Sequence, residues 1–208
     1  MKVLIAVPTY ESISPETFKS IYDLRSQHEL AFEFIKGYDC AKARNEIAKR
    51  AVEIGADYVL MVDSDIILPQ DAVDLLIEDN DSVVVGVYPR KNTNCGETEL
   101  FKLGTYDYVN RYTYSEVEKQ QERFQIKGSG LGCAMIKTEL FSKLSYPYFK
   151  FVTYDDGDVL SEDLFFCSNA TQVGISIFAD SRVKCGHLVK GVMWRKYATL
   201  QNQNWIHS

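Results

Sequence analysis

Apolar runs and amphipathic stretches alternate along the first 88 residues. The apolar runs have the length of strands that are covered on both faces; they are residues 3–7, 30–35, 58–62 and 82–88. The stretches between them have helical spacing; they are residues 15–25, 40–54 and 69–78. This alternation predicts an α/β fold with a Rossmann-like, mostly parallel central sheet and helices on both faces.

Capping residues mark the predicted helices. Ser14 before Pro15 is a typical helix start, and Asp39 can cap a second helix that closes at Gly55. The predicted inner face of the first helix consists of Phe18, Ile21, Tyr22 and the stem of Arg25. The predicted apolar stripe of the second helix consists of Ile47, Ala48, Ala51 and Val52.

The pattern changes after residue 90. Residues 92–125 have no helical period and are rich in tyrosine, which favours a small antiparallel subregion with a half-exposed aromatic face; a sugar-stacking platform is the alternative. Further on we expect a strand at 133–137 and a short helix capped by Thr138. A helix at 164–173 and strands at 175–179 and 182–185 follow. We interpret residues 1–208 as one domain, with halves at 1–90 and 91–190 and a tail or flap at 191–208.

Composition narrows the class of protein. Apolar residues at 46% and charged residues at 25% are ordinary globular values. The net charge of -6 without a dense basic run argues against a nucleic-acid partner. Five cysteines without a C-x-x-C pair argue against a disulfide framework and a zinc ribbon. We find no apolar run long enough to span a membrane, and we expect a cytoplasmic protein.

Two acids follow the third apolar run directly. Asp63 and Asp65 are spaced i and i+2, so an extended chain points both carboxylates the same way. A divalent metal that carries a phosphate would offset their repulsion, although the pair could also simply open a loop or cap a helix. The loop at residues 8–11 and Asp39 fall at the same sheet edge, where ligands of parallel sheets bind.

The order of these motifs resembles the GT-A glycosyltransferases, and among them the inverting family 2 type. The matching stretches run from residue 3 to residue 187; they are Val7-Pro-Thr-Tyr-Glu11, Ala43-Arg-Asn45, Val62-Asp-Ser-Asp65, Gly128-Ser-Gly-Leu-Gly132 with the strand after it, Ser161-Glu-Asp163 and Gly186-His187. Two departures stand out. Asp39 stands alone where relatives carry a longer acidic turn, and the membrane helices of processive members are absent.

The resemblance implies a role for each matching residue. The pocket for the nucleotide of a sugar donor would be lined by Pro8, Thr9, Tyr10, Glu11, Asp39, Arg44, Asp63, Ser64 and Gly130. Asp65, Asp63 and His187 would hold Mn²⁺ or Mg²⁺, in the Asp-x-Asp arrangement that this family uses. Asp163 would be the catalytic base, and the strand at Gly128–Gly132 would lie where donor sugar and acceptor meet.

The implied reaction moves a sugar from a nucleoside-diphosphate sugar, with a UDP-sugar favoured, to a hydroxyl of a carbohydrate, lipid-linked or other acceptor. Arg90 and Lys91 suit an anionic acceptor, or they are an ordinary solvated surface. Three alternatives stay open. They are a retaining GT-A transferase, a nucleotidyltransferase, although the glycine- and arginine-rich phosphate loop of that class is missing after the first strand, and a non-catalytic sugar- or nucleotide-binding module.

Overall fold

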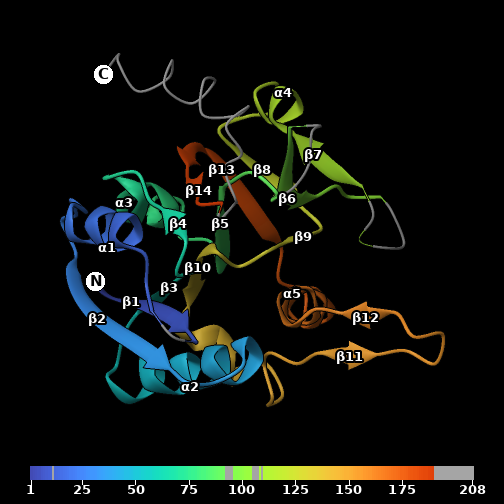
Figure 1. Cartoon of the computed structure of the whole chain (residues 1–208), viewed down its shortest axis with the longest axis horizontal. Helices are drawn as coiled ribbons and strands as arrows, with labels where there is room; N and C mark the ends of the chain where they lie inside the picture. The colour runs from blue at the N-terminus through green and yellow to red at the C-terminus, as the bar shows by residue number, and fades with distance from the viewer. Residues whose placement is uncertain (11, 92–95, 105–107, 109, 190–208) are drawn as a thin grey trace, which may run out of the picture.

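The computed structural model describes residues 1–10, 12–91, 96–104, 108 and 110–189. The first half contains β1 Lys2–Thr9, α1 Pro15–Tyr22, β2 Glu29–Lys36, α2 Cys40–Glu53, β3 Tyr58–Val62, β4 Ile66–Ile67, α3 Ala72–Ile77 and β5 Val83–Val87. The second half contains β6 Glu97–Phe101, β7 Arg111–Thr113, α4 Tyr114–Val117, β8 Arg123–Ile126, β9 Gly128–Ser129, β10 Cys133–Lys137, the 3₁₀ helix η1 Thr138–Ser142, β11 Val152–Thr153, β12 Val159–Leu160, α5 Glu162–Gln172, β13 Ile177–Lys184 and β14 Gly186–His187. Figure 1 shows their arrangement.

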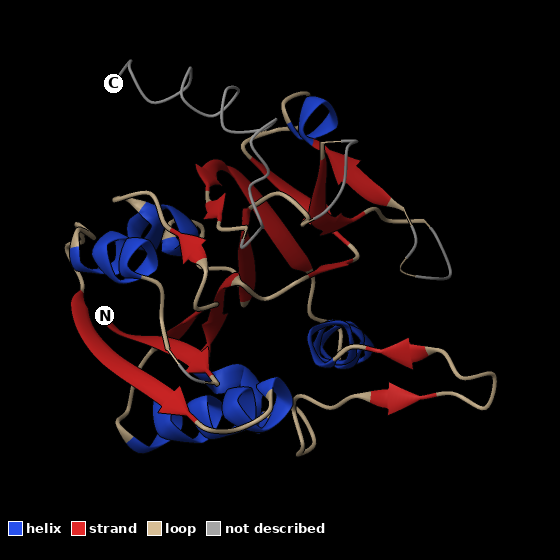
Figure 2. Ribbon diagram, in the orientation of Figure 1, coloured by secondary structure: helices blue, strands red, loops and turns tan. Residues whose placement is uncertain are grey.

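Seven strands of the described chain form the central sheet, in the order β2-β1-β3-β10-β5-β13-β8 (Figure 2). Five of them run the same way, because β1 is parallel to β2 and β3, and β13 is parallel to β5. Strand β10 is antiparallel to both β3 and β5, and β8 is antiparallel to β13. The prediction of an α/β fold with a mostly parallel sheet is confirmed.

Each face of this sheet has its own hydrophobic core. One core joins α2 and α5 to the sheet through residues such as Ile47, Met61 and Phe166. The other joins α1 and α3 to the opposite face through residues such as Ile21, Leu60 and Leu76. Strands β3 and β5 are covered on both sides and are buried throughout. This explains why their sequences are continuous apolar runs. A separate antiparallel sheet, β7-β6-β9, forms the small subregion expected after residue 90.

Several boundaries and faces differ from the predictions. The inner face of α1 consists of Thr17, Ser20 and Ile21, whereas Phe18 is 49% and Tyr22 80% exposed. The short α1 places a hydroxyl-rich stripe toward the sheet, where Ser20 Oγ accepts from the Leu68 N–H at 3.1 Å. The predicted stripe of α2 was wrong at Val52, which is 55% exposed.

Other elements are shorter or joined. The helix expected at 69–78 begins only at Ala72, after Pro69 and a turn. The helix expected at 164–173 begins two residues earlier, at Glu162. The two strands expected between 175 and 185 are one strand, β13, whose register shifts between Asp180 and Lys184. The short helix that Thr138 was expected to cap is a 3₁₀ helix in which Thr138 is the first residue.

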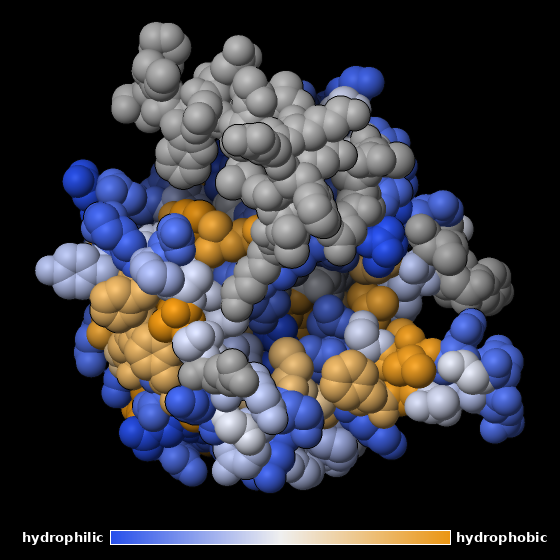
Figure 3. Space-filling view, viewed as in Figure 1, coloured by the Kyte–Doolittle hydropathy of each residue, from blue (hydrophilic) through white to orange (hydrophobic). Residues whose placement is uncertain are grey.

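Apolar side chains also remain on the surface. They gather over α1 and the edge strand β2, and over the β11–β12 hairpin (Figure 3). The exposed residues at these two places are Phe18, Tyr22, Leu30, Phe32, Phe34, Phe151, Tyr154 and Val159. None of the helices described in the structure is long and apolar enough to cross a membrane.

Candidate functional site

The loops after β1 and β3 meet at the carboxyl edge of the sheet. Because Ala6 pairs with Met61, Pro8 and Thr9 fall beside the level of Asp63. The Ser14 N–H, at the start of α1, donates to the Ser64 carbonyl at 3.0 Å. This bond ties the loop after β1 to the acidic loop.

The other residues predicted in the first loop have different surroundings. Thr9 is buried, and its hydroxyl donates to the Ser12 carbonyl at 2.7 Å. Tyr10 is 74% exposed and therefore free to contact a ligand. Glu11 lies outside the described residues. Asp39 is exposed, and its carboxylate accepts from the Lys42 N–H at 2.9 Å, so it caps α2 as the sequence predicted.

Asp63 is held by an internal arginine. Its N–H donates to the Gly132 carbonyl at 3.0 Å, and Arg44 Nη2 donates to Asp63 Oδ1 at 2.8 Å. Arg44 is only 2% exposed and also contacts Glu162 Oε1 at 3.3 Å and the Leu131 carbonyl at 3.2 Å. Burial alone would lower the pKa of Arg44, but the nearby acids, Asp63 above all, raise it well above its usual value.

This geometry gives Arg44 a different role from the one predicted. The sequence predicted a residue that lines an open nucleotide pocket, whereas the structure shows a buried cation that links α2, the end of β3 and the start of α5. Arg44 therefore reaches a ligand only through the orientation it gives to Asp63. The signal for this was present in the sequence, because an arginine in a stripe of alanines is a candidate for a buried ion pair.

Asp65 and His187 come together through a second strand pairing. β14 pairs with β4, and the Leu188 N–H donates to the Asp65 carbonyl at 2.9 Å. His187 Nε2 lies 3.6 Å from Asp65 Oδ1, while its Nδ1 lies 2.7 Å from the Pro89 carbonyl oxygen. The ammonium of Lys91 contacts the other carboxylate oxygen, Asp65 Oδ2.

The charges at this pair shift both pKa values. Burial alone would raise the pKa of Asp65, but hydrogen bonds from His187 and Lys91 lower it to about 2. Burial alone would lower the pKa of His187, but the bonds to Asp65 and to the Pro89 carbonyl raise it. Asp65 is therefore fully ionised at neutral pH.

Asp65 and His187 fit two ligands of a divalent cation. A carbonyl only accepts, so the Pro89 contact places the proton on Nδ1 and, in the neutral ring, leaves the Nε2 lone pair toward Asp65. Two acceptors that face each other at 3.6 Å are stabilised by a proton or a metal ion between them. Carboxylate and imidazole both suit Mn²⁺, and the carbonyl contact is the usual support of a ligating histidine.

The predicted third ligand, Asp63, is turned toward Arg44 rather than toward this pair. Within the described residues, no three histidine, cysteine or acidic side chains are gathered into a complete metal site. A bound phosphate or water can supply further ligands to such an ion. The structure thus unites Asp65 with His187, and Asp63 with Arg44.

Gly130 and Gly132 allow the backbone to approach the site closely. A Cβ at Gly130 would lie 2.5 Å from the Tyr88 hydroxyl oxygen, and one at Gly132 would lie 3.0 Å from Asp63 Oδ2. Tyr88 is buried and its hydroxyl accepts from the Gly132 N–H at 3.0 Å. Burial, with a smaller effect of Asp63, raises the pKa of Tyr88 well above its usual value, so the phenol keeps its proton.

Asp163 also lies close to Gly130. A Cβ there would lie 3.5 Å from Asp163 Oδ2, while Asp163 Oδ1 accepts from the Leu164 N–H at 2.8 Å and from the Ser161 hydroxyl. Burial, then repulsion by Glu162, raises the pKa of Asp163 to about 6 despite these bonds. One oxygen is thus fixed, and the other faces the glycine loop as a carboxylate able to take a proton near neutral pH.

Sequence reasoning missed Tyr88 and Glu162, and it considered Lys91 only as a contact for an anionic acceptor or as a solvated surface residue. Tyr88 and Lys91 follow β5 at the same carboxyl edge as the acids, so the rule that ligands bind at this edge could have identified them. Glu162 could be recognised only from its burial and its contact with Arg44.

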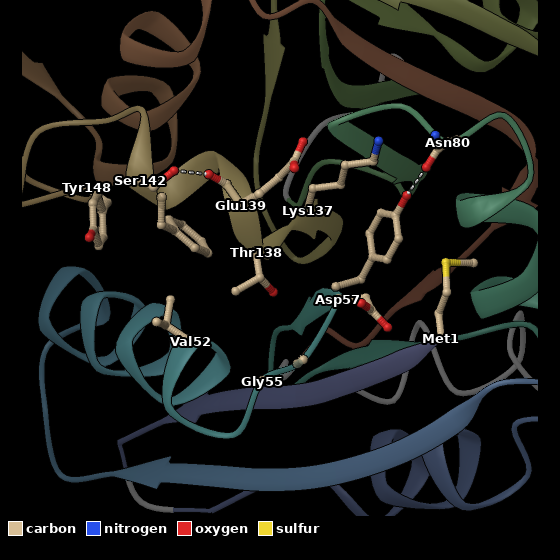
Figure 4. Close-up of a pocket in the computed structure, with 13 residues that line it drawn as sticks. Met1, Val52, Gly55, Asp57, Asn80, Lys137, Thr138, Glu139, Ser142 and Tyr148 are labelled. Atoms are coloured by element: carbon tan, nitrogen blue, oxygen red, sulfur yellow. Dashed lines mark hydrogen bonds between the residues drawn. The ribbon is translucent and has the colours of Figure 1, made fainter.

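A separate cavity of about 620 Å³ lies at the opposite, amino-terminal edge of the sheet (Figure 4). Its walls come from the start of β1 and β3 and from the end of α2, together with Lys137 and η1. It does not include the acids at the carboxyl edge, so we do not assign it to the site above.

Comparison with known proteins agrees with this architecture. No family model and no curated protein matches the sequence. Among solved structures, the crystal structure of A197 from STIV matches with a TM-score of 0.64 and 20% identity, covering 91% of this chain and 87% of that one. GalNAc-T7, crystallised with UDP, GalNAc and Mn²⁺, matches with a TM-score of 0.63 and 12% identity, covering 92% of this chain and 45% of that one.

The chain has a GT-A-like fold. Likeness at these identities establishes the fold alone, because folds host many chemistries. The function therefore has to be argued from the side chains at the carboxyl edge of the sheet.

Proposed function

We propose that this protein is a metal-dependent glycosyltransferase that moves a sugar from a nucleoside-diphosphate sugar to an acceptor hydroxyl with inversion. The observation that carries the proposal is the placement of Asp63 and Asp163 against the same glycine loop, Asp63 at Gly132 and Asp163 at Gly130. One carboxylate pairs with the Arg44 guanidinium at 2.8 Å, and burial raises the pKa of the other to about 6. Two acids in such different environments suit two different roles.

On the acceptor side, Asp163 serves as the general base. Its Oδ2 accepts the proton of the acceptor hydroxyl as that oxygen attacks the anomeric carbon. The bonds from Leu164 N–H and the Ser161 hydroxyl fix Oδ1, so Oδ2 stays directed at the loop. A single base is what an inverting displacement requires.

On the donor side, the loops after β1 and β3 hold the nucleotide. Asp63, oriented by Arg44, accepts from the ribose hydroxyls, and Pro8, Thr9, Tyr10 and Ser64 line the same edge. We favour UDP because a protein of similar fold was crystallised with it. Asp65 and His187 would hold Mn²⁺ or Mg²⁺, which supplies neutralisation of the diphosphate as it leaves.

Thermal unfolding with nucleotides tests the donor assignment. UDP, GDP and TDP-sugars are each added with and without Mn²⁺ to the wild type and to Asp65→Ala. A ligand at 100 times its dissociation constant raises the free energy of unfolding by about 2.7 kcal/mol, a shift of roughly 5–10 °C at this chain length. We expect a Mn²⁺-dependent shift with UDP-sugars that Asp65→Ala loses. Asp155→Ala, in the exposed turn between β11 and β12, is the matched control.

Asp163→Asn tests the catalytic assignment. Turnover of the bound donor should fall about 10²- to 10⁴-fold with little change in donor affinity, because the proton transfer occurs in the transition state. In the wild type, turnover should rise with pH through about 6 as Asp163 loses its proton. Product of retained configuration would reject inversion, and donor binding without turnover in the wild type would favour a non-catalytic binding module.

A further inference from the structure

Lys91 makes an ion pair at the position proposed for the metal. Its ammonium contacts Asp65 Oδ2, while His187 Nε2 faces Asp65 Oδ1. The Asp65 carboxylate thus has the Lys91 ammonium at one oxygen and the His187 imidazole nitrogen, a possible metal ligand, near the other. A divalent cation that binds both Asp65 and His187 has to share or replace the contact with Lys91.

The backbone that precedes Lys91 is held by strand-like contacts, whereas the Lys91 side chain is partly exposed. The Arg90 N–H donates to the Glu97 carbonyl at 2.9 Å, and Pro89 pairs with Thr98. The Lys91 side chain is 38% exposed. Its ammonium can therefore leave Asp65 by rotation of the stem, with no change in the strands.

Charge balance indicates where the ammonium would go. Without a metal, Lys91 offsets the charge of Asp65, and Arg44 lies between Asp63 and Glu162. If a divalent cation binds Asp65, the Lys91 ammonium loses the carboxylate that pairs with it. The diphosphate of the donor, which the metal would bring to the same place, is a group of opposite charge that can accept hydrogen bonds from it.

We propose that Lys91 is an exchangeable counter-cation, which neutralises Asp65 in the metal-free protein and transfers to the donor diphosphate when metal and donor bind. This inference rests on the proposed function for its second step, whereas its first step concerns the metal alone. Lys91 is then a donor-binding residue that also sets the affinity of the free site for metal. Lys91 thereby couples the binding of metal to the binding of donor, because the metal binds more tightly when a diphosphate is present to pair with the lysine.

An ordinary surface ion pair is the competing interpretation, since partly exposed pairs of this kind contribute little to stability. The two interpretations predict different sizes for the change in metal affinity. If the pair is an ordinary one, removing Lys91 changes the metal affinity only as much as removing any nearby positive charge would. If Lys91 competes with the metal, removing it strengthens the binding of metal to Asp65 beyond that.

The experiment compares Lys91→Met with Arg90→Met. Arg90 is the adjacent cation and pairs with Glu97 at 3.2 Å, so its removal changes the net charge equally without touching Asp65. Binding of Mn²⁺ alone is followed by the electron paramagnetic resonance signal of the free ion, and binding of UDP at saturating Mn²⁺ by calorimetry. Circular dichroism confirms that both variants are folded.

We expect Lys91→Met to bind Mn²⁺ alone about threefold to fivefold more tightly than the wild type and Arg90→Met. We expect it to bind UDP with Mn²⁺ about tenfold more weakly, because a charge-assisted contact to phosphate is lost. In an Asp65→Asn background, the gain in Mn²⁺ affinity should disappear.

Other outcomes would each overturn or separate a defined step of the proposal. Equal Mn²⁺ affinities of Lys91→Met and Arg90→Met would reject the counter-cation, and unchanged UDP affinity would reject the transfer to phosphate, even if the wild type binds donor as proposed. A Lys91→Met variant that gains Mn²⁺ binding in a protein that binds no nucleotide would support the counter-cation and reject the proposed function. Absence of Mn²⁺ binding in every variant would reject both.

Discussion

At the scale of single residues, the site is determined by which partner each acid has. Asp63 faces Arg44, Asp65 faces His187 and Lys91, and Asp163 faces a loop without a side chain at Gly130. Identical carboxyl groups are thereby set to a pKa of about 2 in Asp65 and about 6 in Asp163. The sequence could identify all three acids from their positions at strand and helix ends, but their partners depend on contacts across the fold.

The raised pKa of Asp163 predicts an effect on stability that does not depend on its substrate. Its ordinary pKa of 3.8 applies to the unfolded chain, and the folded value is about 6. The folded state therefore binds the proton more tightly, and stability is lost as pH rises from about 4 to 6. We expect Asp163→Asn to be more stable than the wild type at pH 7 by about 3 kcal/mol, because the amide carries no charge.

Urea unfolding at pH 4 and pH 7, without metal, measures this difference. The two proteins should have similar stability at pH 4, where the wild-type carboxyl is protonated in the folded state. A variant that is less stable than the wild type at pH 7 would show that the bonds from Ser161 and Leu164 outweigh burial.

At the scale of elements, strands and helices were predictable where the pattern is local. The apolar runs and the caps Ser14 and Asp39 give the elements of the first half nearly as the structure has them. The position of β10 between β3 and β5 was not predictable, because a strand of five apolar residues carries no sign of which strands it will pair with. The inner face of α1 was misjudged because serine and threonine, rather than its aromatic residues, pack inward.

The loop between β9 and β10 is the element on which the site depends. Gly130 leaves room for the Tyr88 hydroxyl, and the Tyr88 ring packs edge-on against His187 at 5.4 Å between ring centres. We expect Gly130→Ala to lower the free energy of unfolding by about 1–3 kcal/mol, because the new methyl group would overlap a buried phenol. Tyr88→Phe should cost about 1 kcal/mol by removing the partner of the Gly132 N–H.

The double variant separates this overlap from a general effect of the loop. Removing the hydroxyl also removes the atom that the methyl group meets, so the double variant should lose less stability than the two single losses combined. Unfolding of the four proteins in urea gives the coupling, which should be about 1 kcal/mol or more. Strictly additive losses would mean that the phenol moves aside without cost.

At the scale of the whole molecule, the two halves of the chain are joined inside the sheet and at the site. β10, from the second half, pairs with β3 and β5 of the first. Arg44, from the first half, contacts the Leu131 carbonyl and Glu162 of the second. The same guanidinium also orients Asp63. The contacts that hold the first half of the chain to the second half are therefore also contacts that shape the candidate site.

This double role predicts a large effect of Arg44→Met. Glu162 is only 6% exposed, and without Arg44 its charge would be buried and uncompensated. We expect a loss of about 3–5 kcal/mol in the free energy of unfolding. Arg50→Met is the matched control on the same helix, because Arg50 is an exposed residue paired with Glu33 and Glu53, and it should cost less than about 1 kcal/mol.

The double variant Arg44→Met/Glu162→Leu tests the cause. Replacing both partners removes the buried charge, so much of the lost stability should return, although Asp63 would still lack its partner. Urea unfolding followed by both circular dichroism and fluorescence would show whether the halves still unfold in one transition. A variant with Arg44→Met as stable as Arg50→Met would show that Arg44 does not join the halves. Two separate transitions in the Arg44→Met variant, but one in the double variant, would show that the uncompensated charge itself drives the halves apart.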